Sequence, residues 1–190
     1  MDAQDRVRSF QDEHDVVGEP EYQLLDLASE VGELAADACA ATDYGTGDGD
    51  VVTTDVTGDL DASTGDGDVT VERTDGAVTA RTGDGDLVVR GPGSVGDLRT
   101  GDGDLTAEMP AVDGSATIVS DDGDVTLSLG DALDATIDAT TGDGEVSATA
   151  AGFGSVGTVT ETHVVGTVGD GTNELRVHAG DGDVTLARLS

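Results

Sequence analysis

The sequence has no lysine, no tryptophan and a single cysteine, Cys39. A lone cysteine excludes a disulfide framework within the chain and a cysteine-based metal site. No apolar run approaches the length of a membrane-spanning helix. The N-terminal residues also lack the basic, apolar and small-residue order of a secretion signal. These absences predict a protein without a membrane span that stays in the cytoplasm.

Positive charge is scarce as well, because eight arginines face 41 acidic residues and the net charge is -33. A chain this acidic is not expected to bind nucleic-acid phosphates or anionic membrane surfaces. Aromatic residues make up only 2% of the chain. High charge with few aromatics is typical either of disorder or of a halophile's folded protein with a dense carboxylate surface.

A repeat decides between these two classes in favour of the folded one. The motif Thr-Gly-Asp-Gly-Asp begins at Thr46 and returns every 18 residues, at Thr64, Thr82 and Thr100. Looser copies begin at Ser120, Thr141 and Ala179, after steps of 20, 21 and 38 residues. We interpret the last step as two coils of about 19 residues. A fixed period near 20 residues is typical of a solenoid.

Apolar residues keep a constant place relative to the motif. With its first residue as position zero, position +5 holds Val51, Val69, Leu87, Leu105, Val125, Val146 and Val184. Position -2 holds Ala62, Ala80, Leu98, Ile118, Ala139 and Val177. Position -4 holds Leu60, Val78, Gly96, Ala116, Ile137 and Leu175. Apolar positions two residues apart predict half-buried strands, so Val69 and Val78 should face inward and Thr70, Glu72 and Arg81 outward.

Residues 46–190 are therefore predicted to form a mainly β domain, a parallel β-solenoid of about seven and a half coils. Each coil has about 18–21 residues and two strands, and the two sheets face each other across a thin aliphatic core. The Gly-Asp-Gly-Asp turn opens the first strand of a coil, and a looser turn such as Gly91-Pro-Gly opens the second. Glycine is expected where the chain reverses sharply, because it reaches positive φ without strain. Residues 150–172 are the least regular part and cannot be placed in register.

Residues 1–45 are predicted to be a separate helical segment. From about residue 21 to 41, apolar residues recur at steps of three and four, as on one face of a helix. The opposite face carries acidic residues that include Glu30 and Glu33. Such an amphipathic helix would cap the open end of the solenoid, which needs its exposed core and strand edge covered.

The segment Tyr22-Gln-Leu-Leu-Asp-Leu-Ala-Ser-Glu-Val-Gly-Glu-Leu-Ala gives the helix a second interpretation. It resembles the N-terminus of MazG-like nucleotide pyrophosphohydrolases, and the resemblance covers about residues 4–45. In that family a Glu-x-x-Glu and a Glu-x-x-Asp on a later helix hold magnesium against the phosphates of a nucleotide. Glu30 and Glu33 match the first pair and would form a magnesium half-site; this chain has no helix that could supply the second pair. The alternative is that both are solvated residues of the capping helix.

The repeats of residues 46–190 resemble an adhesin-like family of domain-of-unknown-function proteins built from Gly-Asp β-strand repeats. The resemblance implies a β-repeat fold, a protein or surface partner and association with the cell surface. Our leading prediction is a non-enzymatic structural or interaction module, with its partner and oligomeric state left open. The alternatives are a MazG-like nucleoside triphosphate pyrophosphohydrolase remnant that uses magnesium and a repeat protein that binds divalent cations weakly.

The third alternative depends on the similarity of Gly-Asp turns to calcium-binding β-rolls. Their consensus is Gly-Gly-x-Gly-x-Asp-x-U-x with a nine-residue period. When it is laid on the motif at Thr64, the required aspartate falls on Val69, and the period here is doubled. A dedicated calcium cage is therefore not expected. His14, His163 and His178 are scattered in the sequence, and no nucleophile is paired with a base.

Overall fold

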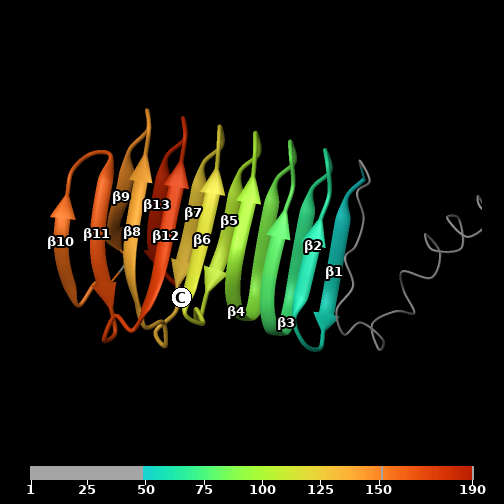
Figure 1. The fold of residues 1–190 in the computed structure, drawn as a ribbon, viewed down its shortest axis with the longest axis horizontal. Helices are drawn as coiled ribbons and strands as arrows, with labels where there is room; N and C mark the ends of the chain where they lie inside the picture. The colour runs from blue at the N-terminus through green and yellow to red at the C-terminus, as the bar shows by residue number, and fades with distance from the viewer. Residues whose placement is uncertain (1–48, 151, 190) are drawn as a thin grey trace, which may run out of the picture. The chain divides into compact units, whose positions relative to one another are not determined.

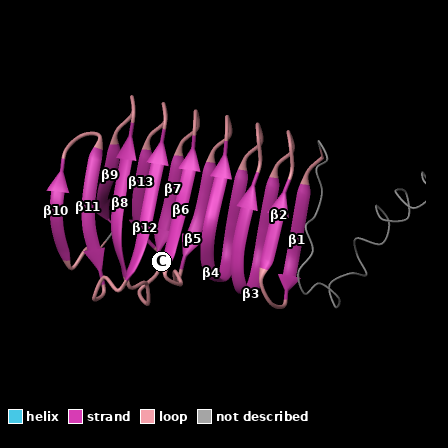
Figure 2. Ribbon diagram, in the orientation of Figure 1, coloured by secondary structure: helices cyan, strands magenta, loops and turns pink. Residues whose placement is uncertain are grey.

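The computed structural model describes residues 49–150 and 152–189. This part of the chain consists of strands joined by turns and contains no helix (Figure 2). No helix here is long and apolar enough to cross a membrane. The predicted capping helix, with Glu30 and Glu33, lies outside the described residues, so the boundary between residues 45 and 46 stays a prediction.

The thirteen strands follow one another at short intervals. In chain order they are β1 (Val51–Val56), β2 (Leu60–Ser63), β3 (Val69–Arg81), β4 (Leu87–Thr100), β5 (Leu105–Met109), β6 (Ser115–Ser120), β7 (Val125–Leu129), β8 (Ala135–Thr141), β9 (Val146–Ala150), β10 (Ser155–Val159), β11 (His163–Val168), β12 (Asn173–Ala179) and β13 (Val184–Arg188).

These strands form two rows, which the chain visits alternately except that β10, β11 and β12 follow one another in the same row (Figure 1). The first row runs β1, β3, β4, β5, β7, β13, β9, and the second runs β2, β3, β4, β6, β12, β8, β11, β10. β3 and β4 belong to both rows because each continues around the corner between them. Every pairing is parallel except those of β11 with β8 and with β10. The coarse prediction of a mainly β, solenoid-like fold is therefore confirmed.

The core follows the period of two that the sequence predicts. Val69 and Val78 are fully buried, and the inward residues of both rows form a single aliphatic cluster. Among the outward residues, Arg81 is exposed, whereas Thr70 and Glu72 are half-buried. Since burial of apolar area drives folding, this thin aliphatic core can replace the missing aromatic residues.

The predicted register is wrong at one residue of position -4. The pairing of β3 with β4 shifts between Val78 and Ala80, so Val78 lies opposite Val95 and Ala80 opposite Leu98. Val95 is buried at the place predicted for Gly96. The extra residue forms a bulge, which is why counting back from the next motif missed it.

The 38-residue step is not two coils, and this prediction was wrong. After β9 the chain forms the antiparallel hairpin β10–β11, which lies beyond β8. It then returns so that β12 lies between β6 and β8, and β13 between β7 and β9. The last motif in the sequence is therefore next to last along the stack (Figure 1). Spacing alone cannot separate a second coil from an excursion of similar length.

Candidate functional site

Close backbone contact explains the second glycine of each Gly-Asp-Gly-Asp turn. A Cβ atom on Gly85 would overlap the carbonyl oxygen of Gly67 in the neighbouring coil, and one on Gly103 would overlap that of Gly85. The stack continues in the order Gly49, Gly67, Gly85, Gly103, Gly123, Gly182, Gly144. None of these glycines has a positive φ. The expected positive φ occurs in the other turns, at Gly58 and Gly91, whereas the motif glycines are required by the approach of adjacent coils.

Hydroxyl groups at position zero tie each turn to the one before it. The Thr82 hydroxyl donates to the Gly67 carbonyl oxygen at 2.7 Å and accepts the Gly85 N–H at 3.3 Å. Thr100, Ser120 and Thr141 make the same pair of bonds. These side chains are buried, so the bonds satisfy backbone groups that water cannot reach. Ala179 is the position zero without a hydroxyl.

The second acidic residue of each motif forms a row that we call the inner row. Oδ1 of Asp68 accepts the backbone N–H of Asp86 at 2.9 Å, and Oδ1 of Asp86 accepts that of Asp104 at 2.9 Å. The full row is Asp50, Asp68, Asp86, Asp104, Asp124, Asp183 and Glu145. Each carboxylate before the last thus holds the next coil. Charge-assisted bonds of this kind are stronger than neutral ones.

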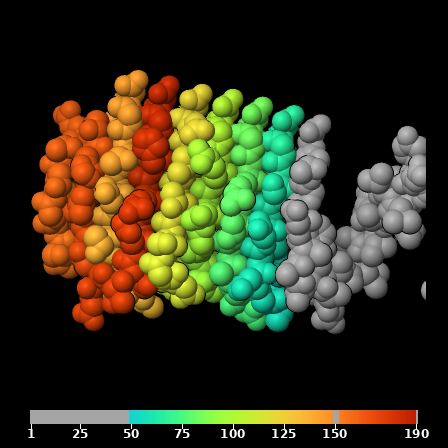
Figure 3. All heavy atoms as spheres, viewed as in Figure 1, coloured from blue at the N-terminus to red at the C-terminus, as the bar shows by residue number. Residues whose placement is uncertain are grey.

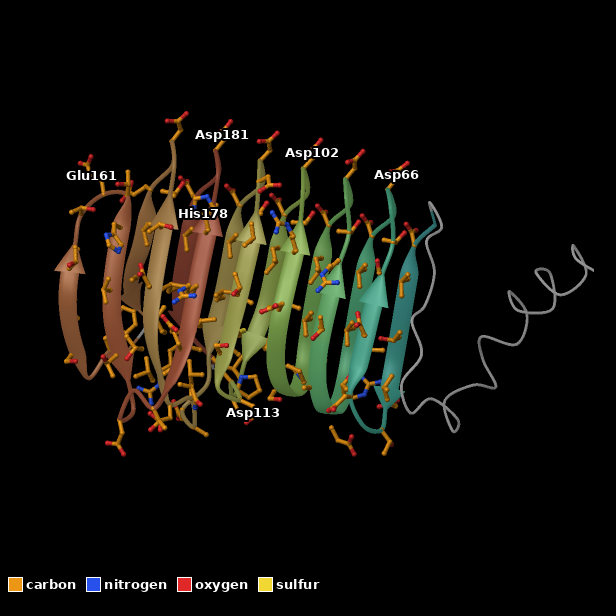
Figure 4. All side chains as sticks on the ribbon, viewed as in Figure 1. Asp66, Asp102, Asp113, Glu161, His178 and Asp181 are labelled. Carbon is orange, nitrogen blue, oxygen red and sulfur yellow. The ribbon has the colours of Figure 1, made fainter. Side chains whose placement is uncertain are left out.

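The first aspartate of each motif forms a second row, the outer row. Its described members, in spatial order, are Asp66, Asp84, Asp102, Asp122, Asp181 and Asp143. All six are exposed, and within the described residues their side chains make no hydrogen bond or ion pair. Figure 4 shows the labelled Asp66, Asp102 and Asp181 at the tips of the turns. In Figure 3 these tips protrude along one edge.

The opposite edge of the coils is built differently. Asp55, Arg73 and Gly91 stack there with positive φ, at 56°, 56° and 60°. Arg73 holds Asp55 through two N–H to carboxylate bonds of 2.5 and 3.0 Å. These bonds lower the pKa of Asp55 and raise the pKa of Arg73.

Later coils have longer loops at this edge, at residues 110–114 and 130–134. The residues that lengthen the repeat to 20 and 21 are placed in these loops. Within the second loop, Asp134 is tied to Gly171 and Thr172. A hydrogen bond from the Thr172 side chain, then backbone N–H groups, lower the pKa of Asp134.

The two histidines of the described part lie near each other in register but have separate partners. His163 and His178 both lie beside Thr140 in the second row. His163 Nε2 is 2.9 Å from Asp138 Oδ1, whereas His178 Nδ1 is 3.1 Å from the Thr140 hydroxyl. No group of three or more histidine, cysteine or acidic side chains in residues 49–150 and 152–189 is arranged to hold a metal ion. The magnesium half-site at Glu30 and Glu33 remains a prediction.

Comparison with known families identifies this fold. A family model described as Toastrack DUF4097 matches residues 81–187. The chain belongs to the Toastrack DUF4097 family. The matched part of this Toastrack domain includes the β10–β11 hairpin and the intercalated strands β12 and β13. The family description names neither adhesion nor a nucleotide reaction, and no curated protein or solved structure matches the chain.

The sequence located the turns of this Toastrack domain but not their chemistry. The signal that could have indicated this chemistry is that the same residue types recur at each position of the motif. Each of these positions either has its own bonding partner or is exposed. The hydroxyl bonds and the inner row require knowledge of which coils are adjacent. The sequence alone therefore did not predict that one aspartate in each copy is structural.

Proposed function

We propose that this chain is a non-enzymatic interaction module that presents the outer row of aspartates to a basic partner. The observation that supports the proposal is the contrast between the two rows. The inner carboxylates accept backbone N–H groups, whereas the outer carboxylates are exposed and make no bond within the described residues. The outer row is thus available for a partner.

Geometry favours a partner with closely spaced basic groups. Adjacent strands in a sheet are about 4.8 Å apart, so the outer row offers a carboxylate at about that interval. The hydrogen bonds of the turn fix the backbone beneath each one. Arginine is the best match, because its guanidinium binds carboxylates through two parallel bonds. The charge of -33 would also speed the approach of a cationic protein or surface.

A binding measurement tests the proposal. The full chain is titrated into a fluorescent arginine-rich peptide at the lowest salt concentration at which circular dichroism shows it folded, beside the triple variant Asp66→Asn, Asp84→Asn, Asp102→Asn. The matched control removes three exposed aspartates elsewhere, with Asp61→Asn, Asp113→Asn and Asp170→Asn. We expect the outer-row variant to weaken binding about tenfold and the control about twofold. Equal losses would show that net charge, rather than the row, attracts the peptide.

The same preparation separates the proposal from its rivals. A MazG-like enzyme would hydrolyse nucleoside triphosphates with magnesium, and its turnover would be lost in Glu30→Ala or Glu33→Ala. Such a result would replace the non-enzymatic proposal. Titration calorimetry with calcium addresses the third alternative, since a stoichiometric micromolar site would make the protein a cation binder. We expect no calcium site, because the inner carboxylates already accept backbone N–H groups. We expect no turnover, because the sequence predicts no second helix with a Glu-x-x-Asp pair.

A further inference from the structure

Strand β10 ends the second row, and its outer edge is open. It pairs with β11, and no other described strand lies beside it (Figure 1). All five of its residues are exposed. Natural proteins protect such edges with charge, proline, shortness or a bulge, because unpaired N–H and C=O groups recruit other strands. β10 is short and has a bulge between Val156 and Val159, but it has neither charge nor proline.

The chemistry of this edge differs from that of the surrounding surface. Val156 and Val159 are 53% and 67% exposed, and among the described residues Val52 is the remaining large hydrophobic residue that is exposed. No charged residue occurs from Val146 to Thr160, although 26% of the whole chain is charged. An uncharged, partly apolar strand edge therefore lies on a protein whose other surfaces repel acidic chains.

We infer that β10 is a self-association edge, at which a second copy of this chain adds its own β10 in antiparallel orientation. Two identical edges related by a twofold axis pair antiparallel, which gives a closed dimer. The rotation places the Gly-Asp turns of the two copies at opposite edges of the joined sheet. Their acidic rows are thereby kept apart, so the neutral edge is where two such acidic copies can meet with the least repulsion.

This inference is independent of the basic partner proposed above, since β10 and the outer row share no residue. The pairing of two five-residue strands buries little area, so we expect a dimer that dissociates on dilution rather than a permanent one. High salt should strengthen it, because screening reduces the repulsion between the two copies.

Sedimentation of the full chain at about 2 M KCl tests the inference over a range of protein concentrations. We expect a monomer–dimer equilibrium. Val159→Asp should raise its dissociation constant about tenfold or more, because the substitution charges the edge. Val159→Lys should do the same, although it lowers the net negative charge. A simple charge effect would instead give the two variants opposite shifts.

Val52→Asp is the matched control, since Val52 is 71% exposed but lies on β1, the first strand of the other row. It should leave the dissociation constant unchanged, and circular dichroism should show all three variants folded. Three results would overturn the inference. They are a wild type that stays monomeric at every concentration, open-ended oligomers in place of dimers, and dimers that survive Val159→Lys. Protection of the β10 amides from hydrogen exchange in a monomer would indicate that another segment of the same chain covers the edge.

Discussion

The two edges of the coils reach the same result, a reversal of the chain, by different means. At the Gly-Asp edge, coil after coil repeats a glycine contact and a carboxylate bond, and most repeat the hydroxyl bond. At the opposite edge, the first three coils share a left-handed residue and later coils have longer loops. The difference shows where the repeat is constrained. In the first three coils backbones touch across coils at both edges, since a Cβ atom on Gly76 or Gly93 would also overlap the neighbouring coil. From residue 110 on, the Gly-Asp edge keeps its glycine contacts and its spacing, whereas the loops of the opposite edge accept inserted residues.

The largest predicted effect concerns salt, because the Gly-Asp edge concentrates like charge. Carboxylates about 4.8 Å apart repel by about 0.9 kcal/mol in water, so the two rows together oppose folding by about 10 kcal/mol before screening. Splayed side chains and the inner-row hydrogen bonds lower this upper bound. At about 1 M salt the repulsion falls to about a fifth. We expect the melting temperature to rise steeply between about 0.05 and 3 M KCl, with loss of β structure at the low end.

Circular dichroism during salt titration measures this effect. Asp84→Asn with Asp102→Asn should flatten the salt dependence, whereas Asp113→Asn, in a loop of the opposite edge, should leave it unchanged. A melting temperature that is independent of salt would show that the charge rows do not limit stability. The corrected strand order strengthens the expectation, since Asp122, Asp181 and Asp143 are consecutive neighbours with no coil missing between them.

The next effect tests the glycine contact. Gly85→Ala places a methyl group on the carbonyl oxygen of Gly67, and the coils must separate to admit it. We expect a loss of about 3 kcal/mol of unfolding free energy. Gly49→Ala is the control, because among the described residues its Cβ would meet no atom within 4 Å. Chemical denaturation at high salt measures both variants, and equal losses would show that glycine serves the turn itself rather than the stacking.

The contrast between constrained and irregular parts of the coils also explains how much of the fold the sequence could predict. Constrained positions recur, so the motif and the ladders that hold Val69 and Val78 predicted the coils and the inward faces. The bulge puts a glycine, Gly96, into the apolar ladder at position -4, and this irregularity was passed over. The insertion of β12 was missed because it leaves the local pattern of apolar residues unchanged. Candidate sites were harder still. An outer aspartate precedes a glycine and an inner one precedes the apolar first residue of a strand, but this context does not show which carboxylate accepts an N–H. The position of the neighbouring coil decides that.

Replacing threonine by valine should lower the free energy of unfolding at one edge and raise it at the other. Thr82→Val, at the Gly-Asp edge, deletes a hydroxyl that bonds two backbone groups, so we expect a loss of about 2 kcal/mol. Thr74→Val acts at the opposite edge, where the Thr74 hydroxyl is buried and has no partner within the described residues. Thr74 is 2% exposed and Thr82 is 6% exposed, so burial does not separate them. Valine should stabilise position 74 by about 1 kcal/mol. Thermal unfolding checks both, and a loss at position 74 would imply a partner for its hydroxyl.

The smallest effect separates the two rows of aspartates. Removing charge relieves repulsion in either row, so Asp86→Asn and Asp84→Asn should both raise stability in low salt. Asparagine keeps a carbonyl oxygen that can accept the Asp104 N–H, whereas alanine does not. At high salt, alanine at position 86 should therefore be less stable than asparagine by about 1 kcal/mol. At position 84 the two variants should have the same stability, because the Asp84 side chain makes no bond within the described residues. Denaturant melts of the four variants give both differences. The stability difference between alanine and asparagine could instead be the same at both positions. In that case the inner row does not stabilise the stack, and the two rows do not differ in their availability to a partner.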